Sequence, residues 1–282
     1  MLSILLPTYN DRCDGLVRTL AAQCASADGL AYEILVGDDG STDQEVVASN
    51  RVINTIPGAR FIERGVNVGR AAIRNWLACE AQGDWLLFID SDMRISTDDY
   101  IIRYRDAARQ WPRSVIYGSY TLAEDPEHGL RYRYEAAAQN GAVRHFCSSN
   151  FMIRRDLFLA HPFDETWKEY GYEDVLFCKN METAGIPVVH GGAPVVFTHW
   201  EGNASFMNKT EEALRVLWRH RDRLRGHSRL LELALAIRQR HLSLPFLLFY
   251  KTFGQVLRQR LVNGRPSAKW FQFYRLLWLL RA

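Results

Sequence analysis

The sequence predicts an α/β protein in which a mostly parallel sheet is flanked by helices and followed by a basic helical extension. The first half alternates continuously apolar runs with segments of helical periodicity, which is typical of parallel strands covered by helices on both faces. With 48% hydrophobic and 24% charged residues, the chain has enough apolar surface for a packed core. The last quarter differs, because residues 209–282 carry a net charge of +12 and the remainder −9.

The elements alternate regularly over the first 113 residues. Strands are predicted at residues 2–9, 32–39, 59–64 and 84–90, and helices at residues 14–26, 41–52, 69–82 and 96–110. Beyond this point we expect a strand at 114–123, mixed helix and strand signals at 135–158, a helix at 172–185, and short strands at 186–192 and 194–200. Right-handed crossovers would join the parallel strands.

Polar side chains follow each of the first four predicted strands. They are Thr8 and Asn10, Asp38 and Asp39, Arg64, Asn67 and Arg70, and finally Asp90 and Asp92. The carboxyl ends of parallel strands meet at one edge of a sheet, and ligands of such sheets bind beyond that edge. We therefore expect these side chains to gather on one rim and to form a site.

Asp90 and Asp92 are separated by a single serine. Two carboxylates this close disfavour each other's ionised forms unless a cation or hydrogen-bond donors lie between them. One interpretation is a solvated turn in which Asp and Ser hold backbone groups. The other is a cation site, and the position of the pair on the common rim favours it.

The five cysteines are scattered, odd in number and contain no CxxC pair, which favours a reducing compartment. The first ten residues lack the basic start of a signal peptide and are interpreted as a strand. We expect a cytoplasmic protein.

Six stretches occur in a fixed order: PTYN, VGDDGSTD, NVGRAAIRN, IDSDM, YEDVLF and HW. Together they resemble the family-2 glycosyltransferases, which have the GT-A (Rossmann-like) fold, over roughly residues 2–205. The resemblance implies an inverting enzyme that moves a sugar from a nucleotide-diphosphate donor, most often a uridine one, to a hydroxyl. The acceptor would be a glycan or a lipid-linked molecule in cell-surface polysaccharide synthesis.

The resemblance implies that Asp92 binds Mn²⁺ or Mg²⁺ and that Asp90 contacts the ribose or the metal's water shell. His199 lies where many family members carry a further metal or diphosphate ligand, and an imidazole ligand favours Mn²⁺. The alternative for His199 is a core histidine that closes a strand. A cation would act as a Lewis acid on the leaving diphosphate, and it would explain why the carboxylate pair is tolerated.

The resemblance also implies a set of nucleotide contacts. They are Pro7, Thr8, Tyr9, Asp38, Asp39, Asn67, Gly69, Arg70, Asp90 and Ser91. Asp38 could accept the imide N–H of uracil while Ser41 or Thr42 caps the following helix. Arg74 is open to two interpretations, a nucleotide contact or a structural salt bridge to an aspartate on the rim.

By the same resemblance Asp174 deprotonates the acceptor hydroxyl, with Glu173 beside it positioning donor or acceptor. The alternative is a carboxylate pair favoured by a helix N-terminus. Candidate sugar-stacking faces or core residues are Trp167, Tyr170 and Tyr172, and Asn150 is a weaker candidate for a sugar contact. Residues 147–149 depart from the glycines that are usual before it, which leaves the shape of the acceptor subsite open.

We expect a catalytic domain at residues 1–205, with a nucleotide-binding half to about residue 113 and an acceptor half at 114–205, and an extension at 206–282. The last predicted helix is too short to span a bilayer. It is expected to lie on an anionic membrane surface at the inner face of the cell membrane. The alternative is packing on the catalytic domain or a homo-oligomer partner. No nucleic-acid-binding motif accompanies the charge, so nucleic acid is not an expected partner.

Two other functions remain open. A nucleotidyltransferase of similar fold would need a glycine-rich basic loop after the first strand, which PTYNDRCDG matches poorly. A non-catalytic nucleotide-sugar-binding subunit would lack Asp92 or Asp174, and both residues are present.

Overall fold

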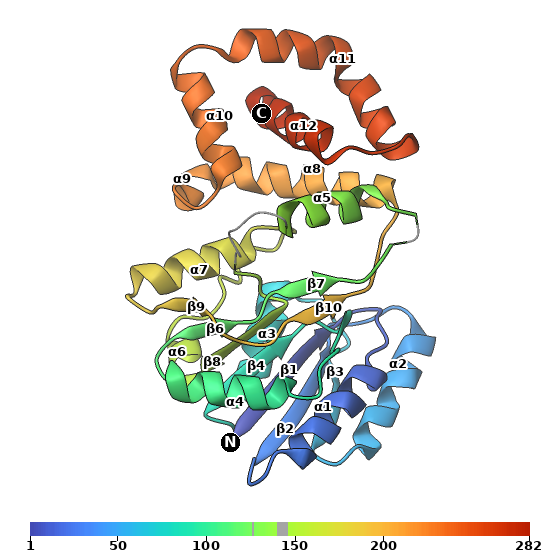
Figure 1. Cartoon of the computed structure of the whole chain (residues 1–282), viewed down its shortest axis with the longest axis vertical. Helices are drawn as coiled ribbons and strands as arrows, with labels where there is room; N and C mark the ends of the chain where they lie inside the picture. Colours follow the sequence, from blue (N-terminus) through green and yellow to red (C-terminus); the bar gives the residue numbers. More distant parts are fainter. Residues whose placement is uncertain (126, 140–145) are drawn as a thin grey trace. The chain divides into compact units, whose positions relative to one another are not determined.

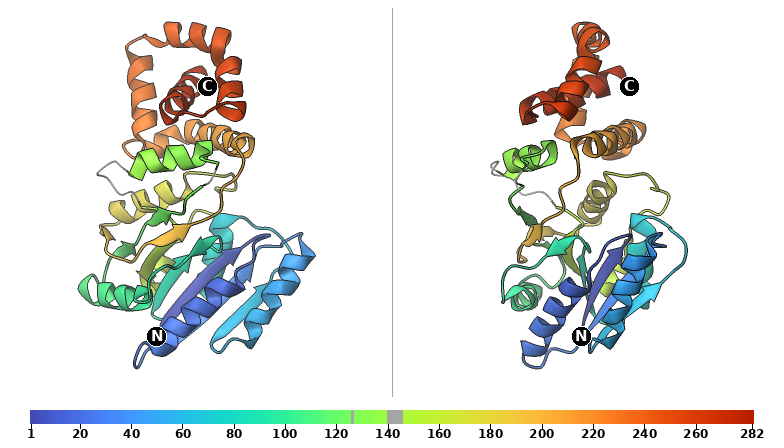
Figure 2. Two further views of the ribbon diagram at one scale, coloured as in Figure 1. Left: turned by 45° about the vertical axis from the view of Figure 1, so that its right-hand side comes forward. Right: turned by 90° about the vertical axis from the view of Figure 1, so that its right-hand side faces the viewer.

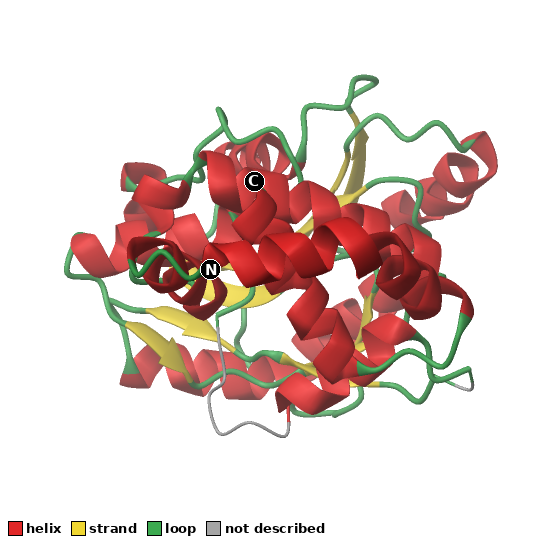
Figure 3. Ribbon diagram, turned by 90° about the horizontal axis from the view of Figure 1, so that it is seen from above, coloured by secondary structure: helices red, strands yellow, loops and turns green. Residues whose placement is uncertain are grey.

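The computed structural model describes residues 1–125, 127–139 and 146–282; the remaining residues are drawn in grey in Figures 1 and 3. The chain divides into two compact units. The sheet unit comprises Met1–Ala123, His145–Lys168 and Asn180–His199. The helical unit comprises Glu124–Arg144, Glu169–Lys179 and Trp200–Ala282.

A seven-stranded sheet forms the centre of the sheet unit (Figure 1). Its strands, in spatial order, are β3 (Ala59–Glu63), β2 (Tyr32–Asp38), β1 (Leu2–Thr8), β4 (Trp85–Ile89), β8 (Asn150–Arg154), β6 (Val115–Tyr117) and β9 (Val188–His190). All neighbours pair in parallel except β8, which runs antiparallel to both β4 and β6. The mostly parallel sheet that the sequence predicts is therefore confirmed.

Helices flank this sheet because its strands are apolar on both faces; β4, for instance, buries every residue from Leu86 to Ile89. The helices are α1 (Asp14–Ser26), α2 (Gln44–Asn50), α3 (Arg70–Glu80), α4 (Tyr100–Gln110) and α6 (Arg155–Ala160), with a short 3₁₀ turn η1 (Arg51–Thr55) after α2. In Figure 1, α1 and α4 lie in front of the sheet and α3 and α6 behind it, and each of these pairs is also in mutual contact.

A second, three-stranded sheet accompanies the first. It consists of β5 (Met93–Arg94), β10 (Val195–Phe197) and β7 (Tyr120–Leu122). The single strand predicted at 114–123 is therefore wrong, because it divides into β6 in the large sheet and β7 in the small one. The division falls at Gly118 and Ser119: Ser119 has φ +58°, and a Cβ at Gly118 would lie 2.0 Å from the Ala193 carbonyl oxygen.

The helical unit contains α5 (Leu130–Gln139), the first residues of α7 (Glu173–Thr183), and α8 (Asn203–Arg219), α9 (Arg221–Leu224), α10 (Arg229–Gln239), α11 (Ser243–Asn263) and α12 (Ala268–Arg281). Figures 1 and 2 show α8, α10 and α11 as a frame in which α12 lies, and α12 contacts all three. Glu211 of α8 links these helices, because one of its carboxylate oxygens accepts hydrogen bonds from Arg258 of α11 at 2.7 Å and from Tyr274 of α12 at 2.8 Å.

The last helix packs inside this unit. Its apolar side chains Phe271, Tyr274 and Trp278 are 1%, 2% and 6% exposed, whereas Trp270 is 53% exposed. The expectation that this helix lies on a membrane is therefore wrong for its main apolar face, which forms core instead. No helix in the described part of the chain is long and apolar enough to cross a membrane.

Candidate active site

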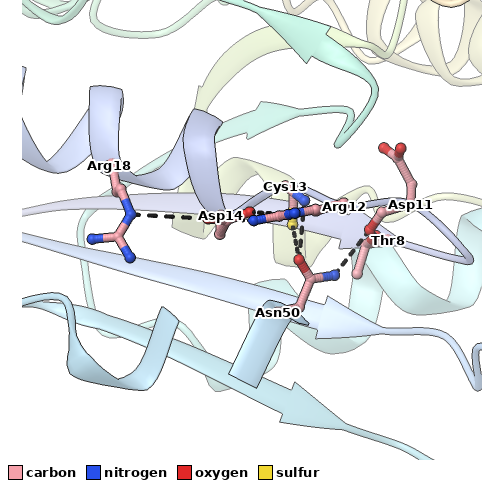
Figure 4. Close-up of polar contacts among 7 residues, drawn as sticks. All are labelled: Thr8, Asp11, Arg12, Cys13, Asp14, Arg18 and Asn50. Carbon is pink, nitrogen blue, oxygen red and sulfur yellow. Dashed lines mark hydrogen bonds and ion pairs between the residues drawn. The ribbon is translucent and has the colours of Figure 1, made fainter. Parts of the chain in front are cut away.

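The loop after β1 is held by side chains of neighbouring segments. Thr8 is buried, and its hydroxyl donates to the Asp11 carbonyl at 3.0 Å. Asn50, at the end of α2, donates to the same carbonyl at 2.9 Å and accepts from the Cys13 backbone N–H at 3.0 Å (Figure 4). The Asp11 carboxylate points away from Asn50, and its Oδ2 is buried without a hydrogen-bond partner among the described residues. Asp11 was not among the predicted contacts, although its position shortly after β1, which ends at Thr8, was the available signal.

The two aspartates after β2 organise the loops around them. The Asp38 carboxylate accepts from the backbone N–H of Ser41 at 3.0 Å and from its hydroxyl. Asp39 accepts from the backbone N–H groups of Val68 at 2.8 Å and Gly69 at 3.0 Å. Both side chains are buried. Asp39 therefore fixes the loop that leads into α3.

The ionisation of Asp39 depends on opposing effects. Burial raises the pKa of Asp39, although the hydrogen bonds from Val68 and Gly69 and the charge of Arg64 act in the opposite direction. The net pKa is above the ordinary value. Both oxygens face backbone donors, so this carboxylate serves first to hold the β3–α3 loop.

The helix after β2, α2, is not capped as expected. Neither Ser41 nor Thr42 caps α2; the N-cap is Asp43, whose side chain accepts from the backbone N–H groups of Glu45 and Val46. Thr42 and Asp43 donate their backbone N–H groups to the Asn10 side chain at 2.8 and 2.9 Å. The loops after β1 and β2 are therefore tied together.

Asp90, after β4, pairs with Arg74 of α3. The Arg74 side chain is 1% exposed and that of Asp90 19%. Arg74 thus forms a structural salt bridge to an aspartate on the rim, which is the second of the two interpretations that the sequence left open for it. Its charge offsets part of the repulsion between Asp90 and Asp92, independently of any metal.

Asp92 directly precedes β5 and His199 follows β10 by two residues, and these two strands are neighbours in the small sheet. The antiparallel register pairs Phe197 with Met93, and extending it by one residue places Thr198 opposite Asp92. The Thr198 hydroxyl contacts the Asp92 carbonyl oxygen at 3.5 Å. His199 is the next residue and is exposed. The structure therefore brings His199 to the Asp92 end of β5, and His199 is not a core histidine.

These residues fit a divalent cation shared with a substrate. Among the described residues, no cluster of three or more His, Cys, Asp and Glu side chains could hold a metal alone. Mg²⁺ and its analogues are commonly bound by one or two carboxylates together with substrate phosphates. One carboxylate and one imidazole, next to the ends of adjacent strands, supply such a partial set, and an imidazole is compatible with Mn²⁺.

The predicted rim is confirmed as an arrangement of strand ends. Asp39 N–H donates to the Thr8 carbonyl at 2.8 Å and Arg64 N–H to the Asp38 carbonyl at 3.2 Å, while Arg74 links α3 to Asp90. Around it lie the other predicted nucleotide contacts. Tyr9, Asn67 and Arg70 are exposed, and Pro7, Gly69 and Ser91 are half-buried. Their roles in binding remain predictions.

Glu173 and Asp174 begin α7 and belong to the helical unit. Glu173 is buried and accepts from the Gly171 backbone N–H at 3.1 Å, whereas Asp174 is half-buried. Two carboxylates in the first turn also suit the helix dipole. The assignment of Asp174 as a base remains a prediction.

The prediction of a sugar contact at Asn150 is wrong, and Trp167 takes the second of its two alternatives, a core residue. Asn150 is fully buried and accepts from the hydroxyls of Tyr100 at 2.6 Å and Tyr104 at 2.7 Å, so it is a core hydrogen-bonding residue. Trp167 is 5% exposed and belongs to the core rather than to a stacking face. Residues 126 and 140–145 of the predicted acceptor half lie outside the described residues.

A twisted, mostly parallel sheet with polar side chains at the carboxyl ends of its strands defines an α/β protein of the nucleotide-binding type. Comparison with known sequences gives the family. The pattern of Glycosyl transferase family 2 matches residues 3–161, more than half of the chain, and the protein belongs to this family.

Two curated relatives are similar over part of their length. An uncharacterized glycosyltransferase of Haemophilus influenzae is 33% identical over 98 residues, which is 35% of this chain and 38% of that protein. The poly(ribitol-phosphate) beta-glucosyltransferase of Bacillus spizizenii is 30% identical over 120 residues, or 42% of this chain and 18% of that protein. The matched segments thus span well under two thirds of either relative.

Two solved structures share the fold. A mannosyltransferase from Pyrobaculum calidifontis, in complex with GDP-Man and Mn²⁺, has a TM-score of 0.58 at 16% identity and covers 99% of this chain and 86% of that one. Glucosyl-3-phosphoglycerate synthase from Mycobacterium tuberculosis, with Mn²⁺ and UDP, has a TM-score of 0.51 at 21% identity and covers 77% and 78%. At these identities the likeness establishes the fold, which is GT-A.

Proposed function

We propose that the protein transfers a sugar, with inversion, from a nucleotide-diphosphate donor to a hydroxyl of a glycan or lipid-linked acceptor. The observation that carries this proposal is the rim in which hydrogen bonds join the ends of β1, β2 and β3 and Arg74 of α3 pairs with Asp90 after β4. Beside it, Asp92 precedes β5 and His199 follows β10, two neighbouring strands of the small sheet. Family membership supports a transferase. The uridine donor and the surface-glycan setting rest on the resemblance, and the relatives' names are compatible with them.

The chain's own residues would divide the work as follows. The loops after β1 and β2, fixed by Asn10, Asp38 and Asp39, would hold the nucleoside. Asp92 and His199 would hold Mn²⁺ or Mg²⁺ together with the donor diphosphate, and the bound cation would supply Lewis-acid stabilisation of the leaving group, worth several kcal/mol. The acceptor oxygen would bond to the anomeric carbon as the bond to the diphosphate breaks.

The proton of the acceptor hydroxyl would pass to the Asp174 carboxylate. General-base assistance of this kind is typically worth roughly 100- to 10,000-fold in rate. Glu173, buried and hydrogen-bonded to Gly171, would hold the start of α7 in place.

Nucleotide release from a panel of UDP-, GDP- and dTDP-sugars, with Mn²⁺, Mg²⁺ or EDTA, tests the proposal. We expect metal-dependent release of one nucleotide, reduced at least about 100-fold in Asp174→Asn and lost in Asp92→Asn. Leu159→Ser, on the surface of α6, is the control. Pyrophosphate release instead would favour a nucleotidyltransferase. Binding without turnover over a wide acceptor panel would favour a non-catalytic subunit.

We further propose that the helical unit binds an anionic membrane surface through α11, because the apolar face of α12 is buried. The supporting observation is that Leu244, Leu248 and Val256 of α11 are 65%, 58% and 47% exposed. Residues 233–282 contain nine Lys and Arg and no Asp or Glu, which suits an amphipathic, cationic contact with anionic lipid.

Sedimentation with phosphatidylglycerol vesicles tests the membrane contact. The double variant Leu244→Ser/Leu248→Ser should sediment several-fold less than the wild type, because each substitution removes an apolar side chain that would be buried among the lipid acyl chains. Leu159→Ser, an exposed leucine of the sheet unit, should sediment normally. Equal sedimentation of all three proteins would disprove the role of α11.

A further inference from the structure

The four residues before α7, Glu169 to Tyr172, are each held by the C-terminal helices. Glu169 pairs with Arg219 at the end of α8. The Tyr170 backbone N–H donates to Glu212 of α8 at 3.2 Å, and the Lys209 ammonium lies over the Tyr170 ring at 6.0 Å. These contacts all fall on one short loop directly before α7. Such a loop has no regular backbone hydrogen bonds of its own, so it depends on them.

The next two residues have backbone conformations that need support. Gly171 has φ +103°, and a Cβ there would lie 2.7 Å from the Ala213 Cβ of α8, so the loop touches that helix directly. Tyr172 has φ +65°, in a region that a bulky side chain rarely adopts. Such a conformation persists only where surrounding contacts hold it.

Arg275 of α12 provides the contact for Tyr172. Its guanidinium donates to the Tyr134 hydroxyl of α5 at 2.8 Å and lies over the Tyr134 ring at 5.3 Å. The same group interacts with the Tyr172 hydroxyl: burial raises the pKa of Tyr172, and Arg275 acts in the opposite direction. One arginine of the last helix therefore joins α5 to the residue immediately before Glu173.

We infer that the C-terminal helices form part of the catalytic apparatus: α8 holds residues 169–171, and Arg275 of α12, which is anchored on Tyr134 of α5, is a positioning residue for Tyr172 and through it for the start of α7. This inference rests on the proposed function, because it assigns Asp174 as the base whose position matters. It differs from a membrane role for the extension, since it concerns the buried face of α12 and not the exposed face of α11.

Hydrogen–deuterium exchange of the full-length protein tests the contact itself. Arg275→Gln should accelerate exchange of peptides covering residues 169–176 by roughly tenfold or more, while peptides of β1 to β4 are unchanged. Arg265→Gln, an exposed arginine of the same extension, is the matched control and should leave both unchanged. Tyr134→Phe removes only the hydroxyl that accepts from Arg275, and it replaces Arg275→Gln if that variant unfolds.

Kinetics separate positioning from stability. In Arg275→Gln the kcat for transfer should fall roughly 10- to 100-fold, while the Kd for UDP stays within about twofold because the nucleotide rim lies on other strands. Arg275→Lys should recover part of the loss. Unchanged kcat, or a kcat loss matched by weaker UDP binding, would overturn the inference. If the wild type turns over no donor, the proposed function fails, and the exchange result then describes a structural contact alone.

Discussion

At the scale of single residues, the carboxylates at the end of β4 show how a like-charged pair is kept in a folded protein. Asp90 does not depend on a metal for a counterion, because Arg74 reaches it from α3 with a side chain that is 1% exposed. Asp92 lies two residues further on, directly before β5, where the hydroxyl of Thr198, the neighbour of His199, contacts its carbonyl oxygen. The two aspartates therefore have different partners, and Asp92 is the better placed of the two for a cation.

The Arg74–Asp90 pair should be costly to break from one side. Arg74→Met leaves the Asp90 charge without its partner next to Asp92, and we expect the free energy of unfolding to fall by about 3 kcal/mol. The double variant Arg74→Met/Asp90→Asn should recover much of this loss, since it leaves no uncompensated charge. Urea unfolding of the two single variants and the double variant measures the coupling. Additive losses would show that the pair does not act as a unit.

Individual residues were predictable from the sequence where their role follows from a strand end. Thr8, Asp38, Asp39 and Asp90 lie on the rim as expected, because strand ends follow from local patterns. Asn150 could not be placed this way. Its partners Tyr100, Tyr104 and the carbonyls of Ser119 and Ala193 are 31 to 50 residues away, and only the folded chain brings them together.

At the scale of elements, the alternating half of the chain was predictable because its strands are apolar on both faces. The bounds of β1, α1 and β2 lie within two residues of the prediction. The segment at 114–123 was not predictable, because its division between two sheets depends on the close approach of Gly118 to Ala193. Local propensity carries no information about such a contact.

Glu201 provides an element-scale prediction, because it connects α5 to α8. It pairs with Arg131 of α5 and Lys209 of α8, both at 2.8 Å. Burial raises the pKa of Glu201, but hydrogen bonds from Lys209 and Ser205 and the charge of Arg131 lower it by more, so the net pKa is below the ordinary 4.5. Its contribution is therefore present above the ordinary pKa and is lost as the pH falls from there through the folded-state pKa.

Thermal melts of wild type and Glu201→Gln at several pH values measure this contribution. At pH 7 the variant should unfold about 2–4 °C lower, corresponding to about 1 kcal/mol. The difference should shrink once the pH is below 4.5. Glu127→Gln, at an exposed glutamate of the same unit, is a control for the loss of one negative charge. A difference that stays constant with pH would show that the Glu201 charge is not responsible.

At the scale of the whole molecule, the charge pattern of the sequence predicted a separate C-terminal extension but not the residues that this extension contacts. The sequence places a boundary at residue 205. In the structure, residues 124–144 and 169–179 group with residues 200–282, because Tyr134 packs against Phe271 at 5.0 Å and residues 169–172 meet α8 and α12. These partners are more than 40 residues apart in the sequence. Hydrophobic periodicity is a local pattern, so it cannot predict which segments contact each other over such a separation.

A fragment of residues 1–205 decides between these two divisions. Without α8, α11 and α12 the fragment keeps the seven strands of the large sheet but loses the packing partners of Tyr134 and the contacts of Glu169 to Tyr172. We expect β1 to β4 to retain slow amide exchange and bind UDP, while residues 127–139 and 169–176 exchange as an unfolded chain does. Transfer to an acceptor should be absent for the same reason. Native-like protection of both segments, with transfer retained, would instead establish residue 205 as a true domain boundary. The helical extension would then be dispensable for chemistry, and its role would have to be sought in the exposed face of α11.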